Sequence, residues 1–370
     1  LYSEIWSDQP PFLTALLAGW TQLFGETVAS TRILIMLFAA LLLWALYLAM
    51  RASVSAAAAI VALLLLLISE YFLRLSGAVM IGLPALALAT TAAAMLVTGR
   101  QPLGWLRIAA AAIVLALALQ TKLIVALMGP TLGAYFLFGP SGAESVSWGK
   151  RIGQAFFFGM VAFGAFVLIA LPFNALQPEQ LIGTHFGAQT WQQTLFLAER
   201  SEFLPNFFRQ HWVYLIVAGI GVAAAWRRQW RDLLFPLVWF VTTLLALTVH
   251  RPLWYHHVIL LTVPLCWLCA YGVEAWVRIF RGLAADISDR ALQQRVAFLV
   301  GSAVLLALVV TMLPVSLEHR QEDQMRVNRP NYIPHIMERF TEDAAQTPAW
   351  VFTDHPFYAF QAGLPVPPPI

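Results

Sequence analysis

The stretch Leu1-Tyr2-Ser3-Glu4-Ile5-Trp6-Ser7-Asp8-Gln9-Pro10-Pro11-Phe12 places two carboxylates and a proline pair directly before a strongly apolar run. Proline is tolerated in the first turn of a helix, because the amide that it lacks has no intrahelical partner there. The proline pair therefore predicts a helix start, with Asp8 and Gln9 beside it. Asp8 has two interpretations at this level: a capping carboxylate opposite the positive helix end, or a functional acid.

The composition is that of a membrane protein, with 60% hydrophobic and only 11% charged residues. Apolar runs of about 17–25 residues, enough to cross about 30 Å of hydrocarbon, recur along most of the chain. Because Leu1 is not an initiating methionine and the chain stops in mid-pattern at Ile370, we expect further residues at both ends. The ten candidate spans lie at 31–50, 54–70, 75–98, 107–121, 123–139, 152–172, 212–226, 233–249, 257–277 and 296–316.

Charges are distributed unequally between alternate connections, as the positive-inside rule predicts for the two sides of a bilayer. One side has an excess of cations and is predicted to be cytoplasmic. The other holds most of the acids, and is predicted to be extracytoplasmic. The start of the chain, residues 173–211 and residues 317–370 share this second side. The predicted cytoplasmic cations are Arg51, Arg100, Arg107, Lys150, Arg151, Arg227, Arg228, Arg231, Arg278, Arg281, Arg290 and Arg295.

The predicted fold class is a polytopic all-α membrane protein. Residues 1–316 form its transmembrane domain, with a first outer loop at 1–30 and a long outer loop at 173–211. The run 12–24 is too short to span, and its aromatic residues favour a helix lying along the membrane surface. Residues 317–370 are predicted to form a small, incomplete extracytoplasmic α/β tail with one helix and one strand.

Several other classes of protein receive no support. The sequence has no Walker loop and no glycine-rich dinucleotide fingerprint, which argues against ATP-driven transport and hydride chemistry. No nucleic-acid partner is predicted. Cys266 and Cys269 stand three apart in an apolar run, so we interpret them as packing residues rather than a disulfide or a metal site.

Ionisable groups gather near the predicted extracytoplasmic ends of the spans, where they are costly unless solvated or paired. Each has an ordinary alternative: Arg74 and Lys122 as cations reaching lipid headgroups, and His185 as a loop histidine. His256 and His257 are a weak metal signal, because adjacent side chains on a helix diverge by about 100°. One is expected to face a cavity while the other packs. Together the groups indicate a site for an anionic headgroup, with an acid for proton transfer or metal binding.

Residues 2–12, followed by residues 23–26 and Arg32, resemble the first outer loop and second span of the GT-C superfamily of polyprenyl-phosphate-sugar transferases. The sequence is most similar to the branch of protein O-mannosyltransferases and the lipid A aminoarabinose transferase. Looser matches are residues 74–80, Thr121-Lys122, residues 251–255 with a cation four residues before a tyrosine, and residues 354–368, which resemble the outer domain of bacterial members.

The resemblance implies a further span and a main catalytic acid upstream of Leu1. It also implies that Gln9 replaces a phosphate-binding lysine of the aminoarabinose branch. Asp8 is assigned to the acceptor side or to a divalent cation (Mg, Mn or Zn). The implied site is catalytic Asp8 and Glu4, donor-phosphate-binding Arg74, Lys122, Arg251 and Tyr255, and substrate-binding Gln9, His185, His256 and His257.

The implied activity moves a sugar from a polyprenyl-phosphate donor to an acceptor hydroxyl on the extracytoplasmic side, with inversion at the anomeric carbon. Membrane lipid and an acceptor protein, lipid or glycan are the expected partners, and the plasma (inner) membrane of a prokaryote is the expected location. Two alternatives remain open: a transporter or flippase of lipid-linked sugars, and a non-catalytic GT-C-like partner. The first would show mid-membrane charges and paired repeats.

Overall fold

The computed structural model describes residues 10–99, 102–140, 146–176, 203–250, 253 and 255–285, with positions 310 and 317, and side chains as far as residue 279. Within these residues every regular element of secondary structure is a helix. The α-helices are α1 (Phe12–Phe24), α2 (Val28–Ser53), α3 (Ala56–Leu67), α4 (Glu70–Gly77), α5 (Gly82–Val97), α6 (Trp105–Leu119), α7 (Gly129–Phe138), α8 (Trp148–Ala170), α11 (Phe203–Gln210), α12 (Trp212–Val249) and α13 (Ile259–Ala285), joined by 3-10 segments η1 (Leu123–Met128), η2 (Leu171–Phe173) and η4 (Tyr255–His257).

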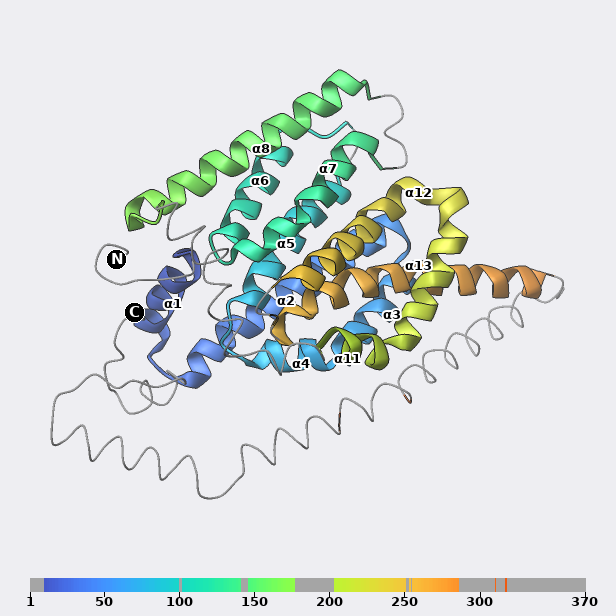
Figure 1. The fold of residues 1–370 in the computed structure, drawn as a ribbon, viewed down its shortest axis with the longest axis horizontal. Helices are drawn as coiled ribbons and strands as arrows, with labels where there is room; N and C mark the ends of the chain where they lie inside the picture. The colour runs from blue at the N-terminus through green and yellow to red at the C-terminus, as the bar shows by residue number, and fades with distance from the viewer. Residues whose placement is uncertain are drawn as a thin grey trace.

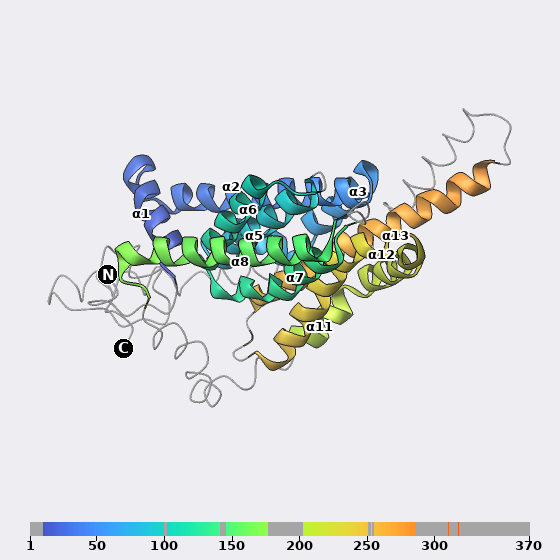
Figure 2. The same ribbon diagram turned by 90° about the horizontal axis from the view of Figure 1, so that it is seen from above.

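The helices pack as one bundle with a continuous core, in which α13 packs mainly against α12 and α3 (Figure 1). The first turns of α13 are buried on all sides, whereas its C-terminal end projects beyond the other helices in both views (Figures 1 and 2). Trp267 is fully buried there, and its indole N–H donates to Ser53 Oγ at 3.0 Å. By contrast, α8 lies along one edge of the bundle and exposes large apolar side chains such as Phe156 and Phe163. Apolar exposure of this kind is what a lipid-facing helix requires.

Nine of the predicted spans fall on these helices, and the one at 296–316 lies almost entirely outside the described residues. By length and composition, four described helices can cross a membrane, or five if the bent pair α3–α4 is one span. The predicted number of about ten is therefore reached only by including shorter helices such as α5, α6 and α7. The helix α5 is buried by protein along most of its length, so it lies in the interior of the bundle.

The predicted boundary between the second and third spans is wrong. Instead of one span ending at residue 70 and the next beginning at 75, residues 70–77 form the separate helix α4, bent by 70° from α3. The break falls at Ile68-Ser69, directly before the Glu70–Arg74 ion pair of 2.8 Å. A charged pair one turn apart stabilises a short helix near an interface, but is costly inside hydrocarbon.

The helix α12 contains both predicted spans 212–226 and 233–249. Gln229 has a non-helical backbone (φ −141°, ψ 32°), and the two halves of α12 turn back on each other at this point (Figure 1). The intervening Trp226-Arg227-Arg228-Gln229-Trp230-Arg231 segment is the polar turn that the sequence predicts between two spans. Two predicted spans are therefore present here, without a loop between them.

The helices α12 and α13 approach at two glycines. A Cβ at Gly221 would collide with the backbone at Gly272 and with the Leu268 carbonyl, and a Cβ at Gly272 would collide with Val217. Small residues of this kind let membrane helices approach with backbone contact. The long helix pair therefore depends on the absence of side chains at these two positions.

Two other predictions can be judged here. The proline pair does begin a helix, because Pro11 is the N-cap of α1. Cys266 and Cys269 are free, buried packing residues, as predicted. The α/β tail at 317–370, apart from position 317, and most of the 173–211 loop lie outside the described residues.

Candidate functional site

Lys122 is the centre of the candidate site. It stands between α6 and η1 in an extended conformation (φ −158°, ψ 125°), and its side chain is buried. Its amide donates to the Ala118 carbonyl at 3.0 Å, so the end of α6 fixes its backbone. A buried lysine is not a cation reaching out to headgroups, so the structure contradicts that alternative for Lys122.

Both predicted histidines contact this lysine. The Lys122 Nζ atom lies 3.1 Å from His256 Nε2 and 3.4 Å from His257 Nε2. Residues 255–257 form a 3-10 turn, in which His257 is buried and His256 is half-buried. That one histidine faces a cavity while the other packs stays a prediction. An ammonium group has only donors, so both imidazoles accept through Nε2. The rings therefore orient the lysine without supplying negative charge.

Arg74 and Tyr255 form a second pair beside this cluster. The Arg74 guanidinium carbon lies 6.0 Å from the centroid of the Tyr255 ring, and the Tyr255 and His256 rings are 5.7 Å apart. Glu70 holds the guanidinium from the other side through the 2.8 Å ion pair. The Tyr255 hydroxyl donates to Met80 Sδ at 3.4 Å, a weak acceptor. The structure thus places Arg74, Tyr255, His256, His257 and Lys122 in one continuous series of contacts.

The beginning of the described chain lies against the same element. Pro10 and Pro11 are buried, and the Phe12 amide donates to the Gln120 carbonyl at 3.0 Å. Gln120 is two residues from Lys122, so the proline pair is fixed next to the cation cluster. The other predicted site residues, Glu4, Asp8, Gln9, His185 and Arg251, lie outside the described residues.

Sequence reasoning missed the residues that hold α4 in place. Tyr71 donates its hydroxyl to Gln210 Oε1 at 3.2 Å, and its ring stacks on His211 with centroids 5.8 Å apart. The fully buried Phe207 also stacks on His211, with ring centroids 4.6 Å apart. Burial lowers the pKa of His211 to about 4, so the ring is neutral near pH 7. The sequence did contain a local signal for these contacts. Tyr71 follows Glu70 in a segment that is too polar for hydrocarbon.

The charged groups segregate to two ends of the bundle. Gly82, where α5 begins, faces His256, whereas Arg107 bonds to Met95 and Thr98 where α5 ends. Likewise α7 starts seven residues after Lys122 and ends next to Arg151, whose guanidinium donates to the carbonyls of Leu137 and Phe138. The cations predicted to be extracytoplasmic and those predicted to be cytoplasmic therefore lie at opposite ends of the bundle.

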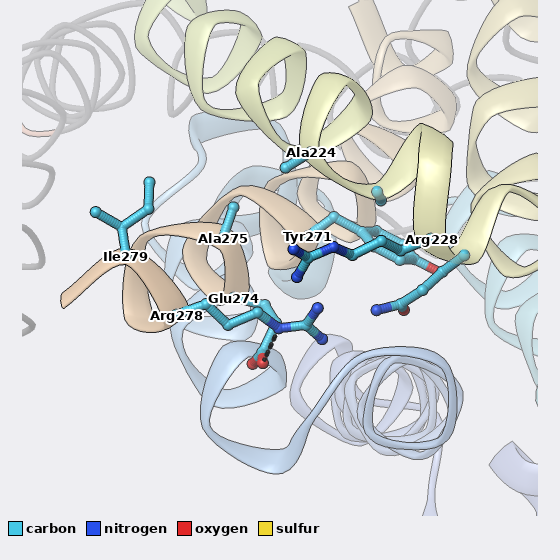
Figure 3. Close-up of a pocket in the computed structure, with 9 residues that line it drawn as sticks. Ala224, Arg228, Tyr271, Glu274, Ala275, Arg278 and Ile279 are labelled. Atoms are coloured by element: carbon cyan, nitrogen blue, oxygen red, sulfur yellow. Dashed lines mark hydrogen bonds and ion pairs between the residues drawn. The ribbon is translucent and has the colours of Figure 1, made fainter. Parts of the chain in front are cut away.

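A cavity of about 340 Å³ lies at the second of these ends, between α12 and α13 (Figure 3). Its polar lining consists of Arg228, Gln229, Tyr271, Glu274 and Arg278. None of these was predicted as a substrate-site residue, although both arginines were among the predicted cytoplasmic cations.

The predicted divalent cation has little to bind to in the described part of the chain. No group of three or more histidine, cysteine, aspartate or glutamate side chains that suits a metal ion occurs there. Asp8, the predicted ligand, lies outside these residues, so the metal stays a prediction and we derive no chemical step through it.

Comparison with known proteins gives a partial family match and a shared fold. The family of dolichyl-phosphate-mannose-protein mannosyltransferases matches residues 8–171. No curated protein matches the chain. Among solved structures, apo ArnT from Cupriavidus metallidurans is similar with a TM-score of 0.62 and 16% identity, over 98% of this chain and 75% of ArnT.

Two further structures share the fold. ArnT bound to undecaprenyl phosphate is similar with a TM-score of 0.59 and 14% identity, over 97% of this chain and 75% of ArnT. The oligosaccharyltransferase of Archaeoglobus fulgidus is similar with a TM-score of 0.56 and 15% identity, over 90% of this chain and 51% of that protein. By its fold the chain is similar to these membrane glycosyltransferases, and residues 8–171 match the family of dolichyl-phosphate-mannose-protein mannosyltransferases.

Proposed function

We propose that this protein transfers a sugar from a polyprenyl-phosphate carrier to an acceptor hydroxyl at the end of the bundle that holds Lys122. The observation that carries the proposal is the buried Lys122 ammonium, oriented by two imidazoles, with Arg74 and Tyr255 beside it. Two cations linked through the Tyr255 and His256 rings suit a phosphate, and arginine offers two parallel donors to its oxygens. The family match and the undecaprenyl phosphate bound by ArnT support a donor of this class.

The proposed reaction is a displacement at the anomeric carbon. A bond forms between the acceptor oxygen and this carbon, while the bond from the carbon to the phosphate oxygen breaks and the electron pair leaves with the phosphate. The charge that develops on the leaving phosphate is what Lys122, Arg74 and Tyr255 would stabilise. Direct displacement inverts the configuration of the sugar.

The acceptor proton needs a base. We assign Asp8 to the acceptor side, because the proline pair that follows it is anchored beside Gln120 and Lys122. A carboxylate close to the acceptor hydroxyl would take its proton during attack. Gln9 and Glu4 are proposed to contact substrate in the same region, with His185 and Arg251 completing the site.

The proposal is tested by deleting the gene and measuring polyprenyl-phosphate-linked sugars by mass spectrometry. We expect one such donor to accumulate, because its consumer is gone. The wild-type gene and Lys150→Gln should clear it, whereas Lys122→Gln should not. Lys150 is the matched control, since it is an exposed lysine at the start of α8. No accumulation, or clearance by Lys122→Gln, would refute the assignment.

A second experiment separates transfer from transport. The accumulated lipid is given to the purified full-length protein in sealed vesicles together with a membrane extract as the source of acceptor. A transferase releases free polyprenyl phosphate and attaches the sugar covalently to another molecule. A flippase leaves the lipid-linked sugar intact and moves it to the other leaflet, and a non-catalytic partner does neither.

A further inference from the structure

We infer that the cavity between α12 and α13 binds the phosphate of an anionic phospholipid headgroup, at the membrane surface opposite the Lys122 cluster. The cavity is lined by Arg228 from the turn of α12 and by Tyr271, Glu274 and Arg278 from α13 (Figure 3). Nothing in the proposed transfer reaction uses these residues. The inference therefore concerns a second site and stands independently of the proposed function.

The position of the cavity is set by the length of α13. Glu274 lies 17 residues after His257, which corresponds to about 25 Å along a helix at 1.5 Å per residue. The hydrocarbon core of a bilayer is about 30 Å thick. If the Lys122 cluster lies near one headgroup layer, the cavity lies near the other.

Aromatic residues mark the same level. Trp226 and Trp230 flank the turn of α12 and are exposed, at 52% and 39% respectively. Exposed tryptophans are typical of the headgroup region, where one edge of the ring contacts lipid and the other contacts water. They occur here within two residues of Arg228, so the cavity opens where lipid phosphates are found.

The charges favour an anion. The cavity carries two guanidinium groups and one carboxylate, and the carboxylate is already engaged: Glu274 accepts from Ser55 Oγ at 2.6 Å and from Arg278 at 3.0 Å. Arg228 forms no hydrogen bond or ion pair with any residue in the described part of the chain. One positive charge is thus left over, on an arginine suited to bidentate binding of phosphate.

The rest of the cavity wall suits a lipid better than a soluble phosphate. Ala224, Ala225 and Ala275 leave the space open, and the exposed Ile279 continues the apolar surface toward the outside. The phosphate headgroup would therefore contact the polar end of the cavity, and the acyl chain would contact its apolar side. Basic pockets between helices at this level of a membrane are known to hold anionic headgroups.

The experiment uses the purified full chain, stripped of lipid, and native mass spectrometry with phosphatidylglycerol, phosphatidylcholine or inorganic phosphate. Wild type should retain phosphatidylglycerol in preference to phosphatidylcholine, and Arg228→Gln should weaken the phosphatidylglycerol complex about fivefold, since one cation near anionic lipid has an effect of that size. Arg227→Gln, which changes an exposed neighbour that does not line the cavity, should match wild type.

A second pair of variants tests the space rather than the charge. Ala224→Leu fills the mouth of the cavity and should weaken phosphatidylglycerol binding, whereas Ala223→Leu, on the same exposed turn but outside the cavity, should not. The inference would be overturned if each cavity variant and its control, in both the arginine pair and the alanine pair, changed phosphatidylglycerol binding equally. If inorganic phosphate binds saturably and displaces phosphatidylglycerol, the site is one for soluble phosphate and the lipid assignment is wrong.

Discussion

At the residue scale, Tyr255 combines a positioned ring with a weakly bonded hydroxyl. Its ring lies against Arg74, while its hydroxyl donates to the thioether of Met80. Since sulfur is a weak acceptor, the hydroxyl can be redirected to a phosphate oxygen at little cost. The contact of the ring with Arg74 places this hydroxyl in the candidate site.

We predict that Tyr255→Phe weakens binding of undecaprenyl phosphate by about tenfold, because a hydrogen bond to a charged group contributes roughly 1.5–3 kcal/mol. The melting temperature should change little, since the hydrogen bond from the hydroxyl to the Met80 sulfur is weak. Binding is measured by native mass spectrometry of the full-length protein, with Tyr47→Phe on α2 as the control. Equal affinity of Tyr255→Phe and wild type would remove the hydroxyl from the site.

His211 shows a different use of an imidazole, as a neutral packing group stacked on both Tyr71 and Phe207. Burial lowers its pKa from 6.5 to about 4, and its Nδ1–H donates to the Phe207 carbonyl at 3.1 Å. The unfolded chain therefore takes up a proton below about pH 6.5 that the folded protein accepts only near pH 4. This contribution to stability is complete above pH 6.5 and is lost as the pH falls toward 4.

We predict that His211→Phe removes this pH dependence while keeping the stacking. The difference in melting temperature between wild type and His211→Phe should shift in favour of the variant as the pH is lowered from 7.5 to 4.5. The measurement is a thermal melt in detergent at several pH values. A difference that stays constant over this range would show that His211 is not a buried neutral histidine.

At the scale of elements, the contact between α12 and α13 depends on glycine. We predict that Gly221→Ala destabilises the protein by about 1–3 kcal/mol, because the added methyl group has no space between two packed backbones. Gly219→Ala is the matched control: on the same helix, a Cβ at Gly219 meets no atom within 4 Å. Thermal unfolding followed by circular dichroism compares the two. Similar losses in both variants would mean that helix propensity, and not close packing, matters here.

The same element pair explains why the turn at Gln229 needs no loop. Both halves of α12 pack on α13, and the polar residues of the turn lie at the end of the bundle. The turn residues Arg228 and Gln229 then become part of a cavity wall. The turn at Gln229, which the sequence predicts only as a charged connection between two spans, therefore also forms part of a cavity wall.

At the scale of the whole molecule, the separation of charges predicts orientation in the membrane. The helix α2 has 26 residues and is about 39 Å long at 1.5 Å per residue, so its two ends lie on opposite sides of a bilayer. We predict that Glu26→Cys reacts with a membrane-impermeant maleimide in intact cells, and that Ala52→Cys reacts only after permeabilisation. Both positions are exposed, and the two native cysteines are buried. The reverse labelling pattern would place the reaction on the cytoplasmic side of the membrane instead of the extracytoplasmic side.

The sequence by itself determined the class of the protein, because a long, weakly charged chain with repeated apolar runs has no stable fold in water. It also determined the start of α1 at the proline pair and the positions of most helices, since these depend on local composition. It identified Arg74, Lys122 and the residues around His256 as site candidates, through charge in apolar surroundings and a family resemblance.

Tertiary structure alone decided how these residues meet. Lys122 and His256 are 134 positions apart, and no local pattern predicts that both histidines contact the lysine. The 3-10 turn at Tyr255–His257, the bend between α3 and α4, and the approach of Gly221 to Gly272 arise because helices from distant parts of the chain compete for the same space. Periodicity in the sequence specifies which residues are apolar, whereas packing against a particular neighbour determines where each side chain points.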